Sequence, residues 1–278
     1  MIWELRHEHK IAILLEVSGL PRSSYYYYIN QKNKPDKYYE VKEAIKEINR
    51  RNKGRYGYRR ITIELHKQNL LINHKTVRRL TKELGLSCRV RMKKYISYKG
   101  NIAETAPNVL ERNFKVDQPN RKWVTDVTEF SLYGEKIYLS PIIDLYNGEI
   151  IAYDISDSPN FKQTLDMLDK AFMKERNVNG IILHSDQGWQ YQMQQYRSLL
   201  KSKGIIQSMS RKGNCLDNAA MENFFGHVKS ELLYLQKFNS MQEFKSELIN
   251  YLDYYNKDRI KLTLGGLTPV EYRLRYVA

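Results

Sequence analysis

The pattern of apolar and polar positions changes once along the chain, near residue 120. Before that point, apolar residues recur at intervals of three and four, as in YYEVKEAIKEI (38–48), and this spacing is typical of a helix with one buried face. Beyond it, short apolar runs alternate with amphipathic segments, which is typical of strands alternating with helices. The pattern therefore predicts an all-helical part followed by an α/β part.

The helical part contains a basic helix-turn-helix pattern. Gly54 ends the helix that contains residues 38–48, a second helix opens near Tyr58, and HKTVRRLTKELGL (74–86) forms a third after the break NLLIN. The third helix carries an apolar stripe, and its other sides carry Lys75, Arg78 and Arg79. A basic second helix suits docking in the major groove, so we expect these three side chains to contact DNA.

Net charge is also spread unevenly along the chain, with a boundary near residue 100 that is a plausible domain edge. Residues 1–100 carry 24 Lys and Arg against 9 Asp and Glu, whereas residues 101–278 carry 22 of each, so the formal charge of +15 lies entirely in the first 100 residues. A segment this basic favours a polyanionic partner, and nucleic acid is the leading candidate because each neutralised phosphate releases counterions.

Cysteine and apolar content indicate a cytoplasmic protein. Cys88 and Cys215 are far apart and form no Cys-x-x-Cys motif, which argues against a zinc ribbon or a disulfide scaffold. The apolar run IAILLEV (11–17) is too short to span a bilayer and contains an acid. Acidic residues near the start do not suit a signal peptide, so we expect no membrane association.

Five strands are predicted in the second part. KWVTDVTEFSL (122–132), EKIYLSPIIDLY (135–146) and GEIIAYDIS (148–156) follow one another closely, whereas GIILHSD (180–186) and IIQSMS (205–210) each follow an amphipathic helix. Three antiparallel strands followed by strand–helix–strand units predict an α/β fold with a mixed five-stranded sheet and flanking helices.

Three acids stand out by their positions. Asp126 lies within the first predicted strand, Asp186 ends the fourth, and Glu222 lies on a helix beside its apolar stripe. A single acid at a strand end is usually a turn former or a helix cap. Asp144, on another apolar strand, is a fourth candidate that its context alone does not exclude.

Grouped carboxylates would suit a divalent cation. Two carboxylates about 4 Å apart repel by roughly 4 kcal/mol at an effective dielectric constant near 20, and a cation removes this penalty. Oxygen ligands favour Mg²⁺ or Mn²⁺. Two such ions can activate a water or a 3′-hydroxyl and stabilise the leaving oxygen at phosphorus, so no nucleophilic side chain is required.

Several motifs in order resemble the second-frame (OrfB-type) transposases of the third insertion-sequence family: WVTDVTEF, LHSDQGWQY, DNAAMENFFGHVKSE and YYNKDRIKLTLGGLTPVEYR. Thirty-five residues separate Asp186 from Glu222, and Lys229 follows seven positions after Glu222, as in the D,D,E core of retroviral integrases. RYGYRRI and TVRRLTKELGL are similar to the family's basic helical region. The resemblance covers nearly the whole chain and leaves Asp144 outside the motif, as a structural or surface residue.

The resemblance implies a ribonuclease-H-like core in which Asp126, Asp186 and Glu222 are the catalytic residues and bind two Mg²⁺ (or Mn²⁺) ions. It implies metal-dependent cleavage of the 3′ ends of a mobile element and strand transfer to another DNA. Lys229 is implied to touch DNA, and Asn218, which lies on the same strip of its helix, is expected to contact DNA as well. The implied DNA contacts of the helical region are Arg55, Tyr56, Arg59 and Arg60.

The resemblance also implies partners. The family works with a first-frame (OrfA-type) protein, often fused to it by ribosomal frameshifting, that supplies terminal-repeat recognition and a leucine zipper. The sequence shows no sustained heptad repeat of its own. Because two element ends must meet, we expect a homo-oligomer on DNA, in the cytoplasm and associated with the nucleoid.

The expected domains are an N-terminal helical segment (1–34), a basic helix-turn-helix DNA-binding region (35–90), a connector (91–118) and an integrase-type catalytic core with C-terminal helices (119–278). Two other functions stay open. One is a DNA-binding repressor or inactive remnant, against which the intact acid triad argues. The other is a nuclease of the same fold that hydrolyses DNA without joining it.

Overall fold

The computed structural model describes residues 2–32, 36–86, 88, 106–211 and 215–277. The helices of the first part are α1 (Ile2–Leu5), α2 (Ile11–Ser18), α3 (Arg22–Lys32), α4 (Tyr39–Arg51), α5 (Tyr58–Lys67) and α6 (His74–Glu83). Most of the predicted connector falls outside the described residues. No helix in the described ranges is both long and apolar enough to cross a membrane.

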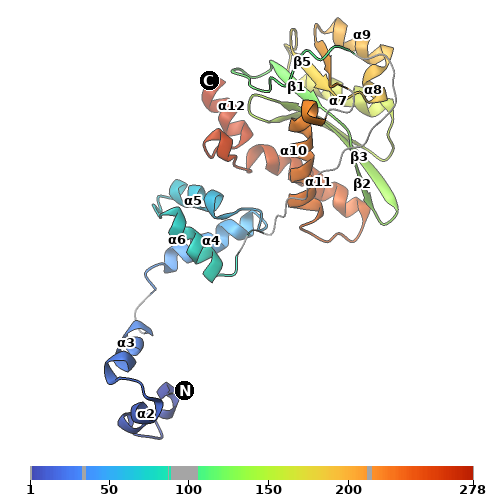
Figure 1. Ribbon diagram of the computed structural model, residues 1–278. Helices are drawn as coiled ribbons and strands as arrows, with labels where there is room; N and C mark the ends of the chain where they lie inside the picture. The colour runs from blue at the N-terminus through green and yellow to red at the C-terminus, as the bar shows by residue number, and fades with distance from the viewer. Residues whose placement is uncertain (1, 33–35, 87, 89–105, 212–214, 278) are drawn as a thin grey trace.

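Helices α4, α5 and α6 pack around a small apolar core, and we call these three helices the helical region (Figure 1). The bend between α4 and α5 contains Gly54 at a φ of 73°, a left-handed conformation that glycine adopts without strain. The side chain of Asn73 caps α6 by accepting a hydrogen bond from the Lys75 backbone N–H at 2.8 Å. One member of this core comes from the other end of the chain: Ile260, which is 1% exposed.

The second part begins with the sheet. Its strands are β1 (Lys122–Thr125), β2 (Thr128–Leu132), β3 (Glu135–Asp144), β4 (Ile150–Ser156), β5 (Ile182–Ser185) and β6 (Ile206–Met209). The helices that follow β4 are α7 (Phe161–Lys174), α8 (Trp189–Gln192), α9 (Gln194–Ser202), α10 (Ala219–Val228), α11 (Met241–Lys257) and α12 (Pro269–Val277). A five-residue π-helical segment, η2 (Lys229–Leu233), continues directly from α10.

The sheet is mixed, as predicted. β3 pairs antiparallel with β1, β2 and β4, whereas β5 pairs in parallel with β1 and β6. β4 pairs with one edge of β3. The other edge pairs with β2 over residues 135–139 and with β1 over residues 142–144, so β1 and β2 follow one another along it. The single strand predicted for 122–132 is therefore two strands, broken at Asp126 and Val127. The sheet has six strands but is five strands wide.

Helices cover both faces of the sheet (Figure 1). Successive residues of β1 point to opposite faces, so Trp123 packs among residues of α7 and α9, and Val124 packs among residues of α10 and α11. Ile142 and Ile143 of β3 divide between the two cores in the same way. Because Val124 points to the face that α10 covers, α10 packs against β1 close to Asp126, which follows the end of that strand.

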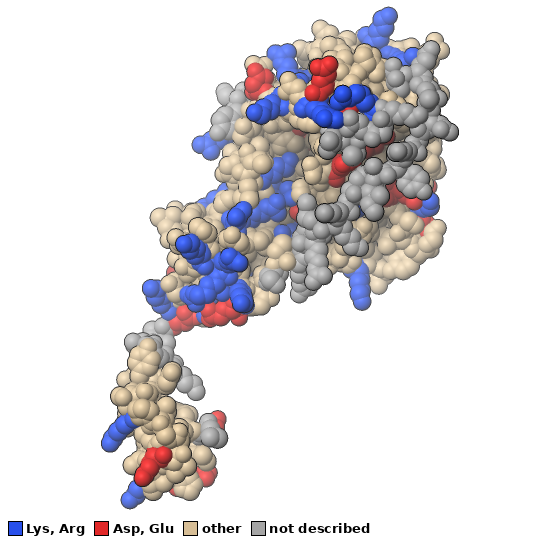
Figure 2. Space-filling model, viewed as in Figure 1, with Lys and Arg blue, Asp and Glu red and all other residues tan. Residues whose placement is uncertain are grey.

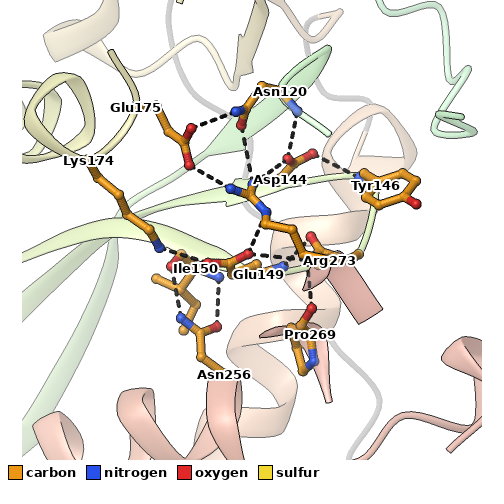
Figure 3. Close-up of polar contacts among 12 residues, drawn as sticks. Asn120, Asp144, Tyr146, Glu149, Ile150, Lys174, Glu175, Asn256, Pro269 and Arg273 are labelled. Atoms are coloured by element: carbon orange, nitrogen blue, oxygen red, sulfur yellow. Dashed lines mark hydrogen bonds and ion pairs between the residues drawn. The ribbon is translucent and has the colours of Figure 1, made fainter. Parts of the chain in front are cut away.

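Helix α12 is held to the sheet by an ion-pair network around Arg273 (Figure 3). Its guanidinium lies 3.0 Å from Asp144, 2.8 Å from Glu149 and 2.6 Å from Glu175. Asp144 is fully buried and also accepts backbone hydrogen bonds from Asn120 and Tyr146. Burial raises the pKa of Asp144, and the two N–H groups and Arg273 act against this shift. Of the two roles left open for Asp144, the structure supports the structural one.

Replacing Arg273 with Ala should destabilise the protein strongly, because it leaves the buried Asp144 carboxylate without its cation. Removing one partner of a buried ion pair typically costs about 3–5 kcal/mol. Urea unfolding should show this loss in the free energy of unfolding. Lys136→Ala, which breaks an exposed pair with Glu129, is the control and should cost less than about 1 kcal/mol. Equal effects of the two substitutions would contradict a clamping role for Arg273.

Candidate active site

Strand pairing brings Asp126 next to Asp186. β1 and β5 are parallel neighbours in which Val124 pairs with His184. Asp126 and Asp186 each stand two positions beyond these partners, so the same register places them level with each other at the carboxyl ends of the two strands. The carboxyl ends of parallel strands are where α/β sheets commonly place functional groups.

Helix α10 supplies the third carboxylate. Its apolar residues Met221, Phe224 and Val228 share one core cluster with Val124 of β1. This packing lays the first turn of α10, which contains Glu222, beside the end of β1. Glu222 comes close enough for its charge to act on Asp126.

The charges of both other acids act on Asp126. Burial raises the pKa of Asp126 well above its ordinary value, and the charges of Asp186 and Glu222 raise it further. The Val127 N–H and the charge of Lys229 oppose the shift. Burial also raises the pKa of Asp186 and of Glu222. Like charges gathered out of water in this way favour either a bound proton or a bound cation.

Backbone and amide N–H groups hold the two aspartates. Asp126 accepts a hydrogen bond from the Val127 backbone N–H at 2.7 Å and another from the Asn218 side-chain amide at 3.1 Å. Asp186 accepts one from the Gly188 backbone N–H at 2.9 Å. Asn218 was expected to contact DNA, but it is 5% exposed and holds Asp126 instead.

The donor set fits a hard divalent cation. In the described ranges, no three His, Cys, Asp or Glu side chains are arranged as ligands of one ion. The three acids nevertheless offer only oxygen ligands, as Mg²⁺ and Mn²⁺ prefer. The Oδ1 atom of Asn218 is buried at the same site with no hydrogen-bond partner within the described residues. A buried oxygen without a partner is a group that an ion or a water would satisfy.

The start of α10 depends on a residue that the sequence did not single out. Asp217 is buried and forms ion pairs with Arg112 at 2.7 Å and Arg211 at 3.0 Å. The hydrogen bond from Arg211 lowers the pKa of Asp217, burial opposes this, and Arg112 lowers it further. Since Asp217 precedes Asn218, this network fixes the residue that holds Asp126. Arg112 lies far from Asp217 in sequence, whereas Arg211 lies near it. Because these partners have no regular spacing, no local sequence pattern could have identified Asp217.

Three of the expected DNA contacts are packed between the helical region and the core. Arg55 is 4% exposed and lies over the rings of Tyr251 and Tyr254. Tyr56 is 1% exposed, and its hydroxyl donates to the Asp258 carbonyl at 2.8 Å. Arg60 lies 3.7 Å from the carboxylate of Glu231. In this arrangement Arg55 and Tyr56 cannot reach DNA, because α11 and the residue that follows it cover them.

The other four basic residues stay on the surface of the helical region. They are Arg59, Lys75, Arg78 and Arg79. Lys and Arg side chains gather over this part of the molecule (Figure 2). Arg79 pairs with Glu83 at 3.2 Å, and Arg59 and Arg78 lie near the ring of Tyr58. Lys229 is the residue at the C-terminal end of α10, and its positive charge lowers the pKa of Asp126.

Comparisons with known proteins match both parts of the chain. Two profiles described as "Integrase core domain" match residues 116–215 and 222–276, and one described as "HTH-like domain" matches residues 38–94. A protein of Escherichia coli (strain K12), named as transposase InsK of insertion sequence element IS150, is 52% identical over 97% of this chain and 95% of its own length. The chain belongs to the insertion-sequence transposases.

Other transposases are similar over most of their length. The transposase of insertion sequence element IS904 from Lactococcus lactis is 35% identical over 84% of this chain and 92% of its own length. Among solved structures, the catalytic core domain of the HTLV-2 integrase, in complex with magnesium, is 18% identical over 56% of this chain, with a TM-score of 0.46. The resemblance to the second-frame transposases is confirmed by the relatives and by the family profiles.

The raised pKa of Asp126 predicts that Asp126→Asn stabilises the metal-free transposase at neutral pH. A carboxyl group whose pKa is higher in the folded state favours folding when protonated, and this contribution is lost as the pH rises above the unfolded value near 3.8. The melting temperature of Asp126→Asn should exceed that of the natural protein at pH 7, by about 2–4 °C for each kcal/mol. The difference should vanish as the pH approaches 4.

Added Mg²⁺ provides a second comparison in the same melting experiment. It should raise the melting temperature of the natural protein, because a ligand that binds only the folded state stabilises it. Asp126→Asn should respond less. A variant that melts below the natural protein at pH 7, or that gains as much from Mg²⁺, would show that Asp126 is not under electrostatic strain.

Proposed function

We propose that Asp126, Asp186 and Glu222 are the catalytic residues of this transposase and that together they bind two Mg²⁺ or Mn²⁺ ions. The observation that carries the proposal is the convergence of three partly buried acids from β1, β5 and α10, which raises the pKa of Asp126. The reaction would be cleavage at the 3′ ends of the element and transfer of the freed 3′-hydroxyls to target DNA.

The residues of the site divide the work. When bound, the two ions would supply an activated water or 3′-hydroxyl and stabilise the leaving oxygen of an in-line displacement. Asp126 and Asp186 stand side by side and would share one ion, and Glu222 would complete the ligands of the other. Asn218 keeps Asp126 oriented through its amide hydrogen bond. Lys229 offsets part of the negative charge of the site and would contact the DNA backbone.

The helical region would hold DNA through its exposed cations. Arg59, Lys75, Arg78 and Arg79 lie on the surface of α5 and α6, and the excess positive charge of the chain lies in its first 100 residues. Phosphate contacts of this kind position a protein on DNA without reading its sequence. We therefore assign recognition of the terminal repeats to a first-frame partner, present as a separate protein or as a frameshift fusion.

The place of action and the assembly follow from the reaction. Two element ends must be held together during transfer, so we infer a homo-oligomer on DNA. The substrate would be chromosomal DNA, which places the protein in the bacterial cytoplasm, at the nucleoid.

Asp126→Asn and Glu222→Gln should abolish cleavage and joining while DNA binding changes little. Loss of a hydrogen-bond partner of a metal ligand commonly costs 10–100-fold in activity, so loss of a ligand should cost more than about 100-fold. The assay is incubation of the protein, fused to its first-frame partner, with labelled element ends and Mg²⁺. Binding is measured separately in Ca²⁺.

Asp169→Asn, an exposed acid on α7, is the matched control and should keep full activity. If the Glu222→Gln variant were nearly as active as the natural protein, Glu222 would not be a catalytic residue and the proposed site would be wrong. Nicked products without any joined product would make the chain a nuclease of the same fold.

Lys75→Ala and Arg78→Ala should weaken binding to any DNA sequence by a similar factor. Each lost phosphate contact lowers the slope of log affinity against log salt by about 0.9. Fluorescence anisotropy over a range of salt concentrations measures both quantities. An unchanged slope in both variants would remove these residues from the DNA-binding surface.

A further inference from the structure

Glu231 is a buried acid that none of the assigned functions uses. It lies in η2, directly after the helix that carries Glu222, and is 2% exposed. A buried carboxylate is costly unless it is paired and hydrogen-bonded. The identity of its partners therefore indicates why the chain keeps a charge at this position.

Partners from the core surround the carboxylate on one side. Arg259 donates two hydrogen bonds to it, at 2.7 and 2.8 Å, and Arg259 is itself 2% exposed. The hydroxyl of Tyr251 on α11 donates a third at 3.0 Å. Two parallel hydrogen bonds from one guanidinium fix the geometry of a carboxylate as well as its charge.

Partners from the helical region reach the same residue from the other side. The guanidinium of Arg60, on α5, lies 3.7 Å from the Glu231 carboxylate. Arg55 donates from its Nε to the backbone carbonyl of Glu231 at 3.0 Å. Glu231 is thus bound through its side chain and its backbone by a region that precedes it by more than 150 residues.

The charge of Glu231 is secured by these arginines. Burial raises the pKa of this carboxyl, but the hydrogen bonds and charge of Arg259, and then the charge of Arg60, outweigh burial and hold its pKa at about 2. Glu231 is therefore ionised wherever the protein is folded near neutral pH. Removing a partner from such a buried pair leaves an uncompensated charge, so loss of one arginine destabilises the contacts of the others with Glu231.

The backbone geometry at Glu231 connects this network to the candidate active site. η2 is a π-helical turn, closed by a hydrogen bond from the Tyr234 N–H to the Lys229 carbonyl at 2.8 Å. π-helical turns are rare and are frequent at functional sites. Because α10 is only ten residues long, a shift at its C-terminal end also moves its first turn, which holds Glu222.

We propose that Glu231 is a positioning residue that couples the docking of the helical region to the placement of Glu222. Arg55 and Arg60 then act on catalysis through Glu231 and α10, not through contact with DNA. The coupling rests on the proposed function only in so far as Glu222 is catalytic. The physical link between the helical region and α10 stands on the contacts alone.

The test compares two substitutions in the network, Arg60→Ala and Glu231→Gln, with two controls. Glu247→Gln breaks the 2.7 Å pair of Glu247 with Lys53, which also joins the core to the helical region but does not involve α10. Arg78→Ala removes an exposed cation of α6. All variants are made in the full chain and measured by hydrogen–deuterium exchange, DNA-binding affinity and single-turnover strand transfer.

We expect Arg60→Ala and Glu231→Gln to speed amide exchange within residues 219–233 by at least about tenfold and to slow strand transfer by a similar factor. The dissociation constant for DNA should change less than about threefold. The double variant should be no worse than Glu231→Gln alone, because both substitutions break one network. Glu247→Gln should leave exchange in α10 unchanged, and Arg78→Ala should weaken DNA binding without changing exchange in α10.

The proposal is overturned if Arg60→Ala leaves exchange in α10 unchanged and instead lowers DNA affinity and its salt dependence, because Arg60 would then be a DNA contact. It is also overturned if Glu247→Gln matches Glu231→Gln. Should Glu231→Gln fail to fold, the half-buried Arg60 still provides the exchange measurement. Amide exchange is measured without the transposition reaction. An active Glu222→Gln variant would therefore refute the proposed function, whereas the exchange results would still test the coupling between the helical region and α10.

Discussion

The parallel pairing of β1 with β5 is the constraint on which the candidate site depends. It sets two carboxylates level with each other at the ends of adjacent strands, where burial and mutual repulsion raise the pKa of Asp126. The fold holds them there through backbone N–H groups and the amide of Asn218, and the packing of α10 across β1 adds a third acid. Apolar packing thus supplies the free energy that keeps like charges together.

Arginines serve two opposite purposes in this transposase. On α6 they remain exposed, where a flexible cation suits a phosphate partner. At the boundary between the helical region and the core they are buried, and each finds a carboxylate, a carbonyl or an aromatic ring. Arg273 follows the second pattern at the far edge of the sheet, where it binds three acids at once. Burial, not composition, separates the two groups.

Much of the fold could be predicted from sequence because apolar periodicity follows burial directly. The alternation of strands and helices was predicted correctly, and the amphipathic helix expected before residues 180–186 is α7. The break at Asp126 was not predicted, since apolar residues continue on both sides of it. The three acids stood out by their sequence context, the motif resemblance separated them from Asp144, and in the structure the charges of Asp186 and Glu222 act on Asp126. The burial of Arg55 and Tyr56 could not be predicted, because a basic segment has the same composition whether it faces DNA or another part of the chain.

Ile260 has a consequence for how the chain is made. It fills a place among α4, α5 and α6, although it lies near the other end of the sequence. During synthesis, which proceeds from the N-terminus, the helical region cannot complete this core until residue 260 has been translated. A fragment that ends before residue 260 would contain these three helices without one of the buried side chains of their core.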